Sequence, residues 1–120
     1  MNIEELRSYC LNIKGASECL PFDEYTLVIK VLDKMFTLIP LDNERLSISL
    51  KCDPEKAIEL REHYNAVEPA WHFNKKYWNT IYLNNDMADD DVKKWIRHSV
   101  EEVVKKMPKK IREEYFSNTL

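Results

Sequence analysis

The sequence of 120 residues has one glycine, three cysteines and no long apolar run, and each shortage excludes a class of protein. A glycine-rich phosphate loop needs several glycines, so the nucleotide-hydrolysing and dinucleotide-binding classes are excluded. Cys10, Cys19 and Cys52 are odd in number and widely spaced, which argues against a disulfide framework and fits a reducing compartment. No apolar stretch approaches the roughly 20 residues that span a bilayer, so membrane insertion is not expected.

The N-terminal residues and the overall charge narrow the setting further. Residues 1–5 open directly into a helical pattern without the basic and apolar regions of a signal peptide, so we expect the cytosol. At 44% hydrophobic composition, residues 1–120 are expected to form a single domain with one core. The net charge of −3 means that the whole molecule repels polyanions, and any contact with nucleic acid must come from a local patch.

The hydrophobic periodicity predicts an α+β protein. Helices are predicted over residues 3–14, 54–64, 89–107 and 109–115, and strands over 26–31, 35–39, 46–50 and 78–83. Asn2 with Glu5, and Asp53 before Pro54, are typical helix starts. The strand over 46–50 alternates with Ser47 and Ser49, which suggests one wet face. This order of helix, three strands, helix, one or two strands and helix predicts a two-layer sandwich, with an antiparallel sheet and helices packed on one side.

Residues 69–80 are the most specialised segment, because they hold two Trp, a Phe, a Tyr, a His and two Lys between regular elements. One interpretation is structural: Trp71, Phe73 and Trp78 cover the sheet edge. In another, lysines contact phosphates, Trp71 and Tyr77 stack on bases, and Asn74 or Asn79 bonds base edges. The candidate nucleic-acid-binding residues in that second interpretation are Lys51, Trp71, His72, Asn74, Lys75, Lys76, Tyr77, Trp78 and Asn79.

Catalytic and metal sites are not predicted. His63, His72 and His98 have no ligand spacing, so we expect no metal, and nothing in the sequence calls for a cofactor. Cys52 precedes a helix start, where a thiol becomes reactive, but a packed strand-end residue is the favoured interpretation because no base is placed beside it. The basic residues over 105–112 fit either a charged helix end or a surface for phosphate or an acidic protein.

Several of these motifs together resemble the MmcQ/YjbR family of small bacterial proteins. They are Leu27 to Val31 before Lys34-Met35-Phe36, Leu50 to Pro54, Leu60 to Tyr64, Pro69 to Thr80, and Ser99. The resemblance implies an α-β-β-β-α-β-β-α order, similar to secretion-chaperone-like folds and to a double-wing DNA-binding domain of a phage transcription factor. Members usually have Gly in the first hairpin, His before the Trp and Tyr after the Ser, where this chain has Leu32-Asp33, Tyr77 and Val100.

Two functional classes follow, and neither is an enzyme. By resemblance, the chain is a cytoplasmic DNA-binding module that uses its hairpins and residues 71–78, with weak, salt-sensitive affinity. The alternative is a protein- or small-ligand-binding module that uses the same aromatic surface, which the acidic balance favours. Lysines converging on one face would support the first class, and scattered lysines around a concave aromatic pocket would support the second. The oligomeric state is open, and a monomer is compatible with the sequence.

Overall fold

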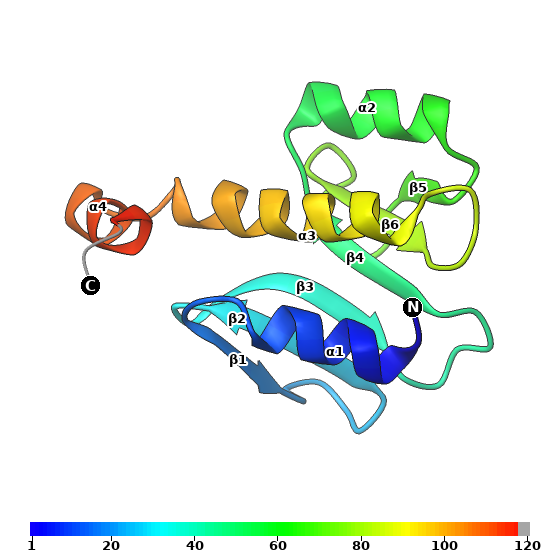
Figure 1. Ribbon diagram of the computed structural model, residues 1–120, viewed down its shortest axis with the longest axis horizontal. Coiled ribbons are helices and arrows are strands. Elements are labelled where there is room, and N and C mark those ends of the chain that lie inside the picture. The colour runs from blue at the N-terminus through cyan, green and yellow to red at the C-terminus, as the bar shows by residue number, and fades with distance from the viewer. Residues whose placement is uncertain (118–120) are drawn as a thin grey trace.

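A computed structural model describes residues 1–117, which form a six-stranded antiparallel sheet with four helices (Figure 1). The strand order across the sheet is β1-β2-β3-β4-β6-β5. The strands are β1 (Ala16–Cys19), β2 (Thr26–Val31), β3 (Lys34–Pro40), β4 (Ser47–Lys51), β5 (Val67–Pro69) and β6 (Trp78–Tyr82). The helices are α1 (Ile3–Leu11), α2 (Pro54–His63), α3 (Asp89–Val104) and α4 (Lys109–Phe116). The predicted α+β class is confirmed.

The edge strand β1 is an addition to the predicted elements, whereas the edge strand β5 makes up the two strands that the predicted order allowed after the helix over 54–64. β1 pairs with β2 alone, and β5 pairs with β6 alone. Because each edge strand forms by pairing with one neighbour, its own sequence needs few residues with high strand propensity. β5 ends in Pro69, which an edge strand tolerates because proline cannot donate to a ladder. α1 ends at Leu11, earlier than predicted, because the chain must turn back through Gly15, whose φ of +78° suits glycine, to begin β1.

The β2–β3 hairpin turn differs slightly from the prediction, because β3 already begins at Lys34. Its two turn residues are Leu32 and Asp33, both with positive φ, at 49° and 66°. Two consecutive positive φ values are the geometry of a type I′ turn, whose twist matches that of the strands. Glycine or asparagine usually occupies such positions, so this chain makes the turn without its preferred residues.

The three longer helices cover one face of the sheet, and α3 crosses its middle (Figure 1). Alternate strand residues point to this face and form the core with the apolar stripes of the helices. The core includes Leu6, Cys10, Ile29, Phe36, Ile39, Ile48, Leu50, Ile81, Val92, Ile96 and Val100, all buried. The helix caps that start α1 and α2 form as predicted: Asn2 and Glu5 make a capping box, and Asp53 accepts from the Lys56 N–H at 3.2 Å.

Ser99 of α3 lies between β3 and β4 and bonds both strands. Its Oγ accepts from the Lys51 N–H at 2.9 Å, and its hydroxyl donates to the Phe36 carbonyl at 2.6 Å. The direct pairing of β3 with β4 covers only Thr37 with Leu50 and Leu38 with Ser49. Ser99 therefore satisfies backbone groups just beyond that ladder, where buried unpaired groups would be costly.

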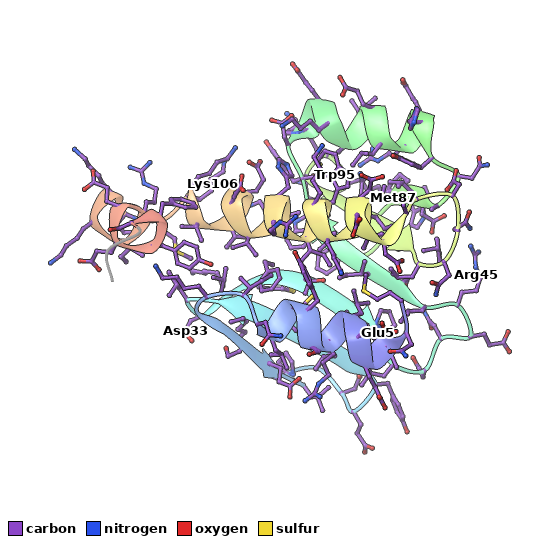
Figure 2. The ribbon with its side chains drawn as sticks, in the orientation of Figure 1. Glu5, Asp33, Arg45, Met87, Trp95 and Lys106 are labelled. Carbon is purple, nitrogen blue, oxygen red and sulfur yellow. The ribbon has the colours of Figure 1, made fainter. Side chains whose placement is uncertain are left out.

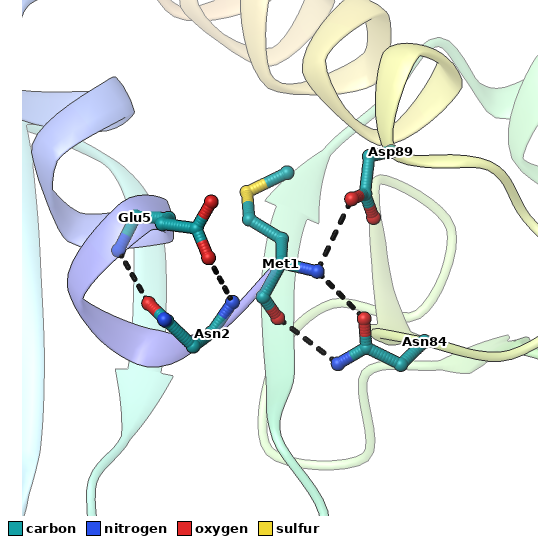
Figure 3. A network of polar contacts seen from close by, with 5 residues as sticks. All are labelled: Met1, Asn2, Glu5, Asn84 and Asp89. Carbon is teal, nitrogen blue, oxygen red and sulfur yellow. Dashed lines mark hydrogen bonds and ion pairs between the residues drawn. The ribbon is translucent and has the colours of Figure 1, made fainter.

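Contacts distant in sequence hold the two ends of the described chain against the body. The Met1 amino group donates to Asn84 Oδ1 at 2.6 Å and reaches Asp89 at 3.1 Å, while Asn84 donates back to the Met1 carbonyl (Figure 3). At the far end of α3, Tyr115 of α4 donates to the Lys14 carbonyl at 2.7 Å. These bonds connect α1 to both ends of the α3 region.

Candidate ligand-binding pocket on the open face of the sheet

The sheet face opposite the helices carries a pocket of about 620 Å³. The register explains its position. Leu38 pairs with Ser49, Ser49 with Thr80, and Thr80 with Glu68, so these side chains form one row across four strands. The pocket is lined by Phe22, Thr26, Leu38, Pro40, Asn43, Ser47, Ser49, Glu68, Ala70, Trp71, His72, Phe73, Thr80 and Tyr82. It therefore combines a floor of strand residues with a rim made by loops.

The floor of the pocket is rich in hydroxyl groups. Ser49 and Thr80 hydroxyls lie 2.9 Å apart across β4 and β6, and Ser47 pairs with Tyr82 one row away. Small side chains at these positions leave the sheet face hollow, while their hydroxyls can donate to or accept from a bound molecule. This is the face of the strand over 46–50 that was predicted to be wet, but Ser47 and Ser49 are only 3% and 6% exposed, so the prediction of a solvated face is wrong for both.

The rim is aromatic. Phe73 stacks on Trp78, with ring centroids 4.8 Å apart and planes 21° from parallel. Backbone turns fix the intervening loop: the Phe73 N–H donates to the Ala70 carbonyl at 3.0 Å, and the Ala70 N–H donates to the Trp78 carbonyl at 3.1 Å. Trp71 is left 61% exposed at the top of this loop, and Phe22 is 70% exposed. Such exposed aromatic surface beside a hollow is typical of binding sites.

Arg61 of α2 holds the loop from behind. Its Nε donates to Asn79 Oδ1 at 2.6 Å, and its Nη2 donates to the Lys75 carbonyl. The Asn79 amide in turn donates to the Ala57 carbonyl at 3.2 Å. Asn79 is only 1% exposed, so its amide is engaged in the interior and is not available to a base edge, contrary to its predicted role.

Glu68 supplies the formal negative charge of the pocket. The Tyr82 hydroxyl donates to Glu68 Oε1 at 2.8 Å, and this bond is the main cause that raises the pKa of Tyr82 above its ordinary value. The guanidinium carbon of Arg45 lies 4.0 Å from the Tyr82 ring centroid, on the outer rim. No lysine or arginine is among the lining residues, and the remaining titratable one is His72.

The three candidate lysines lie on or beside the aromatic loop, and each has a distinct environment. Lys75 lies 4.4 Å from the Trp71 ring centroid and Lys76 lies 5.5 Å from that of Tyr77, so both stay on the aromatic loop. Lys51 pairs with Trp78 across β4 and β6, and the Cys52 N–H donates to the Tyr77 carbonyl at 2.7 Å, so the Lys51 backbone lies beside the aromatic loop, while its ammonium group lies near the C-terminal end of α3. Burial lowers its pKa, and the neighbouring charges of Lys106 and Lys105 lower it further. Figure 2 shows Lys106 at that end of α3 and Arg45 at the opposite end of the molecule.

The other predicted residues of the loop have distinct positions. His72 lines the pocket and is exposed. Asn74 is exposed, and its Oδ1 accepts from the Lys76 N–H at 3.0 Å. Tyr77 and Trp78 are half-buried, and Trp78 is the stacking partner that supports the rim. Of the predicted set, only Trp71 and His72 therefore line the pocket directly.

Thiol, imidazole and metal chemistry have little support here. Burial raises the pKa of Cys10 and of Cys52 to about 12, which keeps both thiols protonated and unreactive. His98 Nε2 accepts from the Asp53 N–H at 3.2 Å, and burial lowers the pKa of that imidazole. Within residues 1–117, no group of three His, Cys, Asp or Glu side chains is placed to hold a metal ion. Over the same residues, no helix is both long and apolar enough to cross a bilayer.

Most of the lining residues were not predicted as site residues, among them Phe22, Glu68 and Tyr82. Tyr82 and Thr80 alternate with Ile81 in a predicted strand, so the sequence predicts that they share one face of the sheet. It does not predict which of the two faces the helices cover. Glu68 lies outside the predicted helices and strands, and Phe22 lies in a loop. Only the pairing of β5 with β6 brings Glu68 beside Thr80 and Tyr82.

Comparison with known proteins agrees with this architecture. The family model described as YjbR matches residues 11–101. The uncharacterized protein YjbR of Escherichia coli K12 is 33% identical over 112 residues, covering 93% of this chain and 95% of that protein. The uncharacterized protein YbdF of Escherichia coli O157:H7 is 26% identical, covering 91% and 93%.

Solved structures extend the likeness to the fold. The crystal structure of Deinococcus radiodurans protein DR2400, a DUF419 domain, has a TM-score of 0.88 and 35% identity, covering 99% of this chain and 91% of that one. A Pseudomonas syringae protein has a TM-score of 0.72 at 24% identity, covering 82% and 96%, and shares the fold. The chain belongs to the YjbR family.

Proposed function

We propose that this YjbR-family chain is a cytoplasmic binding module that holds a small organic ligand, without catalysis, in the pocket on its open sheet face. The carrying observation is the pocket itself: about 620 Å³, with a hydroxyl floor and an aromatic rim. Ligand sites in proteins commonly enclose roughly 300–1,000 Å³, lined by apolar and aromatic groups with a few polar ones. Short side chains on β4 and β6 form the floor of this hollow. A sheet face that serves only as protein surface needs no such hollow.

Binding without catalysis fits the chemistry of the lining residues. Ser49 and Thr80 bond each other, so neither hydroxyl is paired with a base that would activate it. Glu68 accepts from the Tyr82 hydroxyl, an arrangement that orients the carboxylate. These contacts supply hydrogen bonds and shape, which are sufficient for recognition.

The test is a fragment screen read by two-dimensional amide NMR on the full chain. Fragments with an aromatic ring are expected to shift the resonances of the floor and rim, and Trp71→Ala is expected to weaken their binding about tenfold or more by removing stacking area. Ile58→Ala is the matched control, because Ile58 is also an exposed apolar residue, 53% exposed, but lies on α2. Shifts confined to other surfaces, or equal weakening by both substitutions, would contradict the proposal.

DNA binding is the second candidate, supported by the family's double-wing likeness and by the cations beside the aromatic loop. Lys75 on Trp71 and Lys76 on Tyr77 would place ammonium groups near stacking surfaces. The acidic Glu68 in the pocket, and the lack of lysine and arginine among the described lining residues, favour the ligand proposal instead.

Fluorescence anisotropy with a labelled duplex and a single strand, at about 50 and 200 mM salt, tests this candidate. Binding that falls steeply with salt, and that Lys75→Glu with Lys76→Glu weakens across all sequences, would support it. Lys93→Glu with Lys94→Glu makes the same charge change on α3, outside the candidate surfaces, and is the control. Equal loss in the two variants would indicate general charge attraction, and no binding at low salt would remove DNA from consideration.

A further inference from the structure

We infer that the ligand of the open-face pocket carries a positively charged amine on an aromatic or apolar body, with the amine at Glu68. This inference rests on the proposed function, because it names the chemical class that the same pocket would select. Two observations support it: the formal charge of the lining and the free capacity of the Glu68 carboxylate.

The lining presents a formal negative charge and no lysine or arginine. Glu68 belongs to the floor row with Thr80 and Ser49, and it is half-buried. A ligand with a phosphate or carboxylate head would face this carboxylate with no cation from the lining to offset it. An ammonium group would instead gain a charge-assisted hydrogen bond, which is roughly twice as strong as a neutral one.

The Glu68 carboxylate has room for such a bond. Its Oε1 accepts from the Tyr82 hydroxyl at 2.8 Å, and no bond to Oε2 occurs among residues 1–117. An ionised carboxylate has about four acceptor positions on its two oxygens, so one tyrosine leaves most of them unused. The tyrosine also holds the carboxylate in place, so a ligand amine would meet an oriented group.

Two aromatic walls already attract cations from the protein itself. The Lys75 ammonium lies 4.4 Å from the Trp71 ring centroid, and the Arg45 guanidinium carbon lies 4.0 Å from that of Tyr82. Ring faces attract positive charge through their quadrupole. Lys75 and Arg45 are exposed on the rim, where solvent and salt screen their repulsion, whereas Glu68 is half-buried, where attraction to an amine is stronger.

The experiment compares three probes with the same indole ring and different head groups: tryptamine with charge +1, tryptophol with charge 0 and indole-3-acetate with charge −1. Each is titrated into the full chain to about 10 mM, since molecules this small bind weakly. Amide NMR shifts of the pocket residues give the dissociation constants. Tryptamine is expected to bind about tenfold more tightly than tryptophol, and indole-3-acetate most weakly.

Glu68→Gln separates charge from shape, because glutamine keeps an oxygen that can accept from Tyr82. It is expected to weaken tryptamine about tenfold while tryptophol changes less than about twofold. Glu114→Gln on α4 is the control for removing one exposed negative charge, and it is expected to leave both affinities unchanged. A tryptamine preference that survives Glu68→Gln would overturn the role of Glu68.

The remaining outcomes distinguish this inference from the proposed function. Equal binding of all three probes in the pocket would overturn the amine preference and leave ligand binding standing. If none of the probes shifts the pocket resonances, both proposals fail. Sedimentation of the unliganded chain tests a further occupant: a dimer that Trp71→Ala dissociates would mean that a second copy covers this face, which would also overturn the inference.

Discussion

The two faces of the sheet share the same strands but have different roles. On the helix-covered face, alternate residues such as Ile29, Leu50 and Ile81 are buried against α1, α2 and α3. On the open face, their neighbours Ser49, Thr80 and Glu68 form a polar row under an aromatic loop. Apolar burial on the helix-covered face therefore supplies most of the folding free energy. The residues of the open face contribute less to stability and can instead suit a ligand.

Polar groups differ between the faces in the same way. On the covered face, Ser99 and Asn79 are buried, and each bonds two partners in the interior. On the open face, Ser49 is also buried, but its hydroxyl bonds the Thr80 hydroxyl alone among residues 1–117, and Glu68 accepts from Tyr82 alone. Buried polar groups that are fully paired specify structure, whereas partly paired groups at a hollow are suited to recognition.

The largest effect is expected from Ser99→Ala. The substitution would leave the Lys51 N–H and the Phe36 carbonyl unpaired inside the protein, and would lower the free energy of unfolding by about 2–3 kcal/mol. Ser49→Ala on the open face removes one hydroxyl contact beside Thr80 and is expected to cost about 1 kcal/mol or less. Urea denaturation measures both. Similar losses in the free energy of unfolding of the two variants would contradict the proposed difference between the two faces.

Adjacent residues of β6 provide the next comparison. Asn79→Ala removes the acceptor of Arg61 and the donor to the Ala57 carbonyl, so it is expected to lower the free energy of unfolding by about 2 kcal/mol. Hydrogen exchange in the loop over 70–77 should also become faster, because Arg61 anchors that loop. Thr80→Ala, one residue along and on the other face, is expected to cost about half as much or less. Unchanged exchange would show that Arg61 holds the loop independently.

A smaller effect is expected from pH, through His98 on the covered side. Burial lowers the pKa of the folded-state imidazole below its ordinary value of 6.5, and its Nε2 accepts from the Asp53 N–H. The unfolded chain therefore binds a proton first as pH falls, so this contribution to stability is complete above about pH 6.5 and declines below it.

His98→Gln tests that pH dependence, because glutamine can accept the same N–H and does not titrate. Denaturation between pH 7.5 and 5, in the range where histidine changes charge, is expected to give a shallower loss of stability for the variant. The carboxylates are common to both proteins, so their contribution cancels in the difference. Parallel curves would contradict the assigned role.

The smallest effect on stability is expected at Trp71. Its side chain is 61% exposed on the rim, so Trp71→Ala should change the free energy of unfolding by only about 0.5 kcal/mol. The same variant is expected to lose ligand affinity, so it would separate the effect on ligand binding from the effect on stability. A loss of more than about 2 kcal/mol would indicate that the rim supports the fold, as in the structural interpretation of this segment.

Local signals were sufficient for most elements. Asn2 with Glu5 and Asp53 with Pro54 marked helix starts that the structure contains, because capping depends on residues close in sequence. Alternation in the strand over 46–50 identified which residues face away from the helices, but Ser47 and Ser49 are buried there and are not solvated. β1 could not be predicted, because its sequence Ala-Ser-Glu-Cys has no strand pattern. The strand forms by pairing with β2. The family likeness also depended on short motifs, and the comparisons confirmed it.

The α+β class, the main helices and strands, and the aromatic character of residues 69–80 follow from local sequence, since periodicity, capping and composition act over a few residues. The choice of the sheet face that the helices leave open, and of the side chains that meet there, depends on the folded arrangement. Glu68 meets Tyr82 across 14 residues of chain, and Lys51 meets Ser99 across 48. Such encounters follow from strand order and register, which are set by the packing of the whole chain and by no single segment.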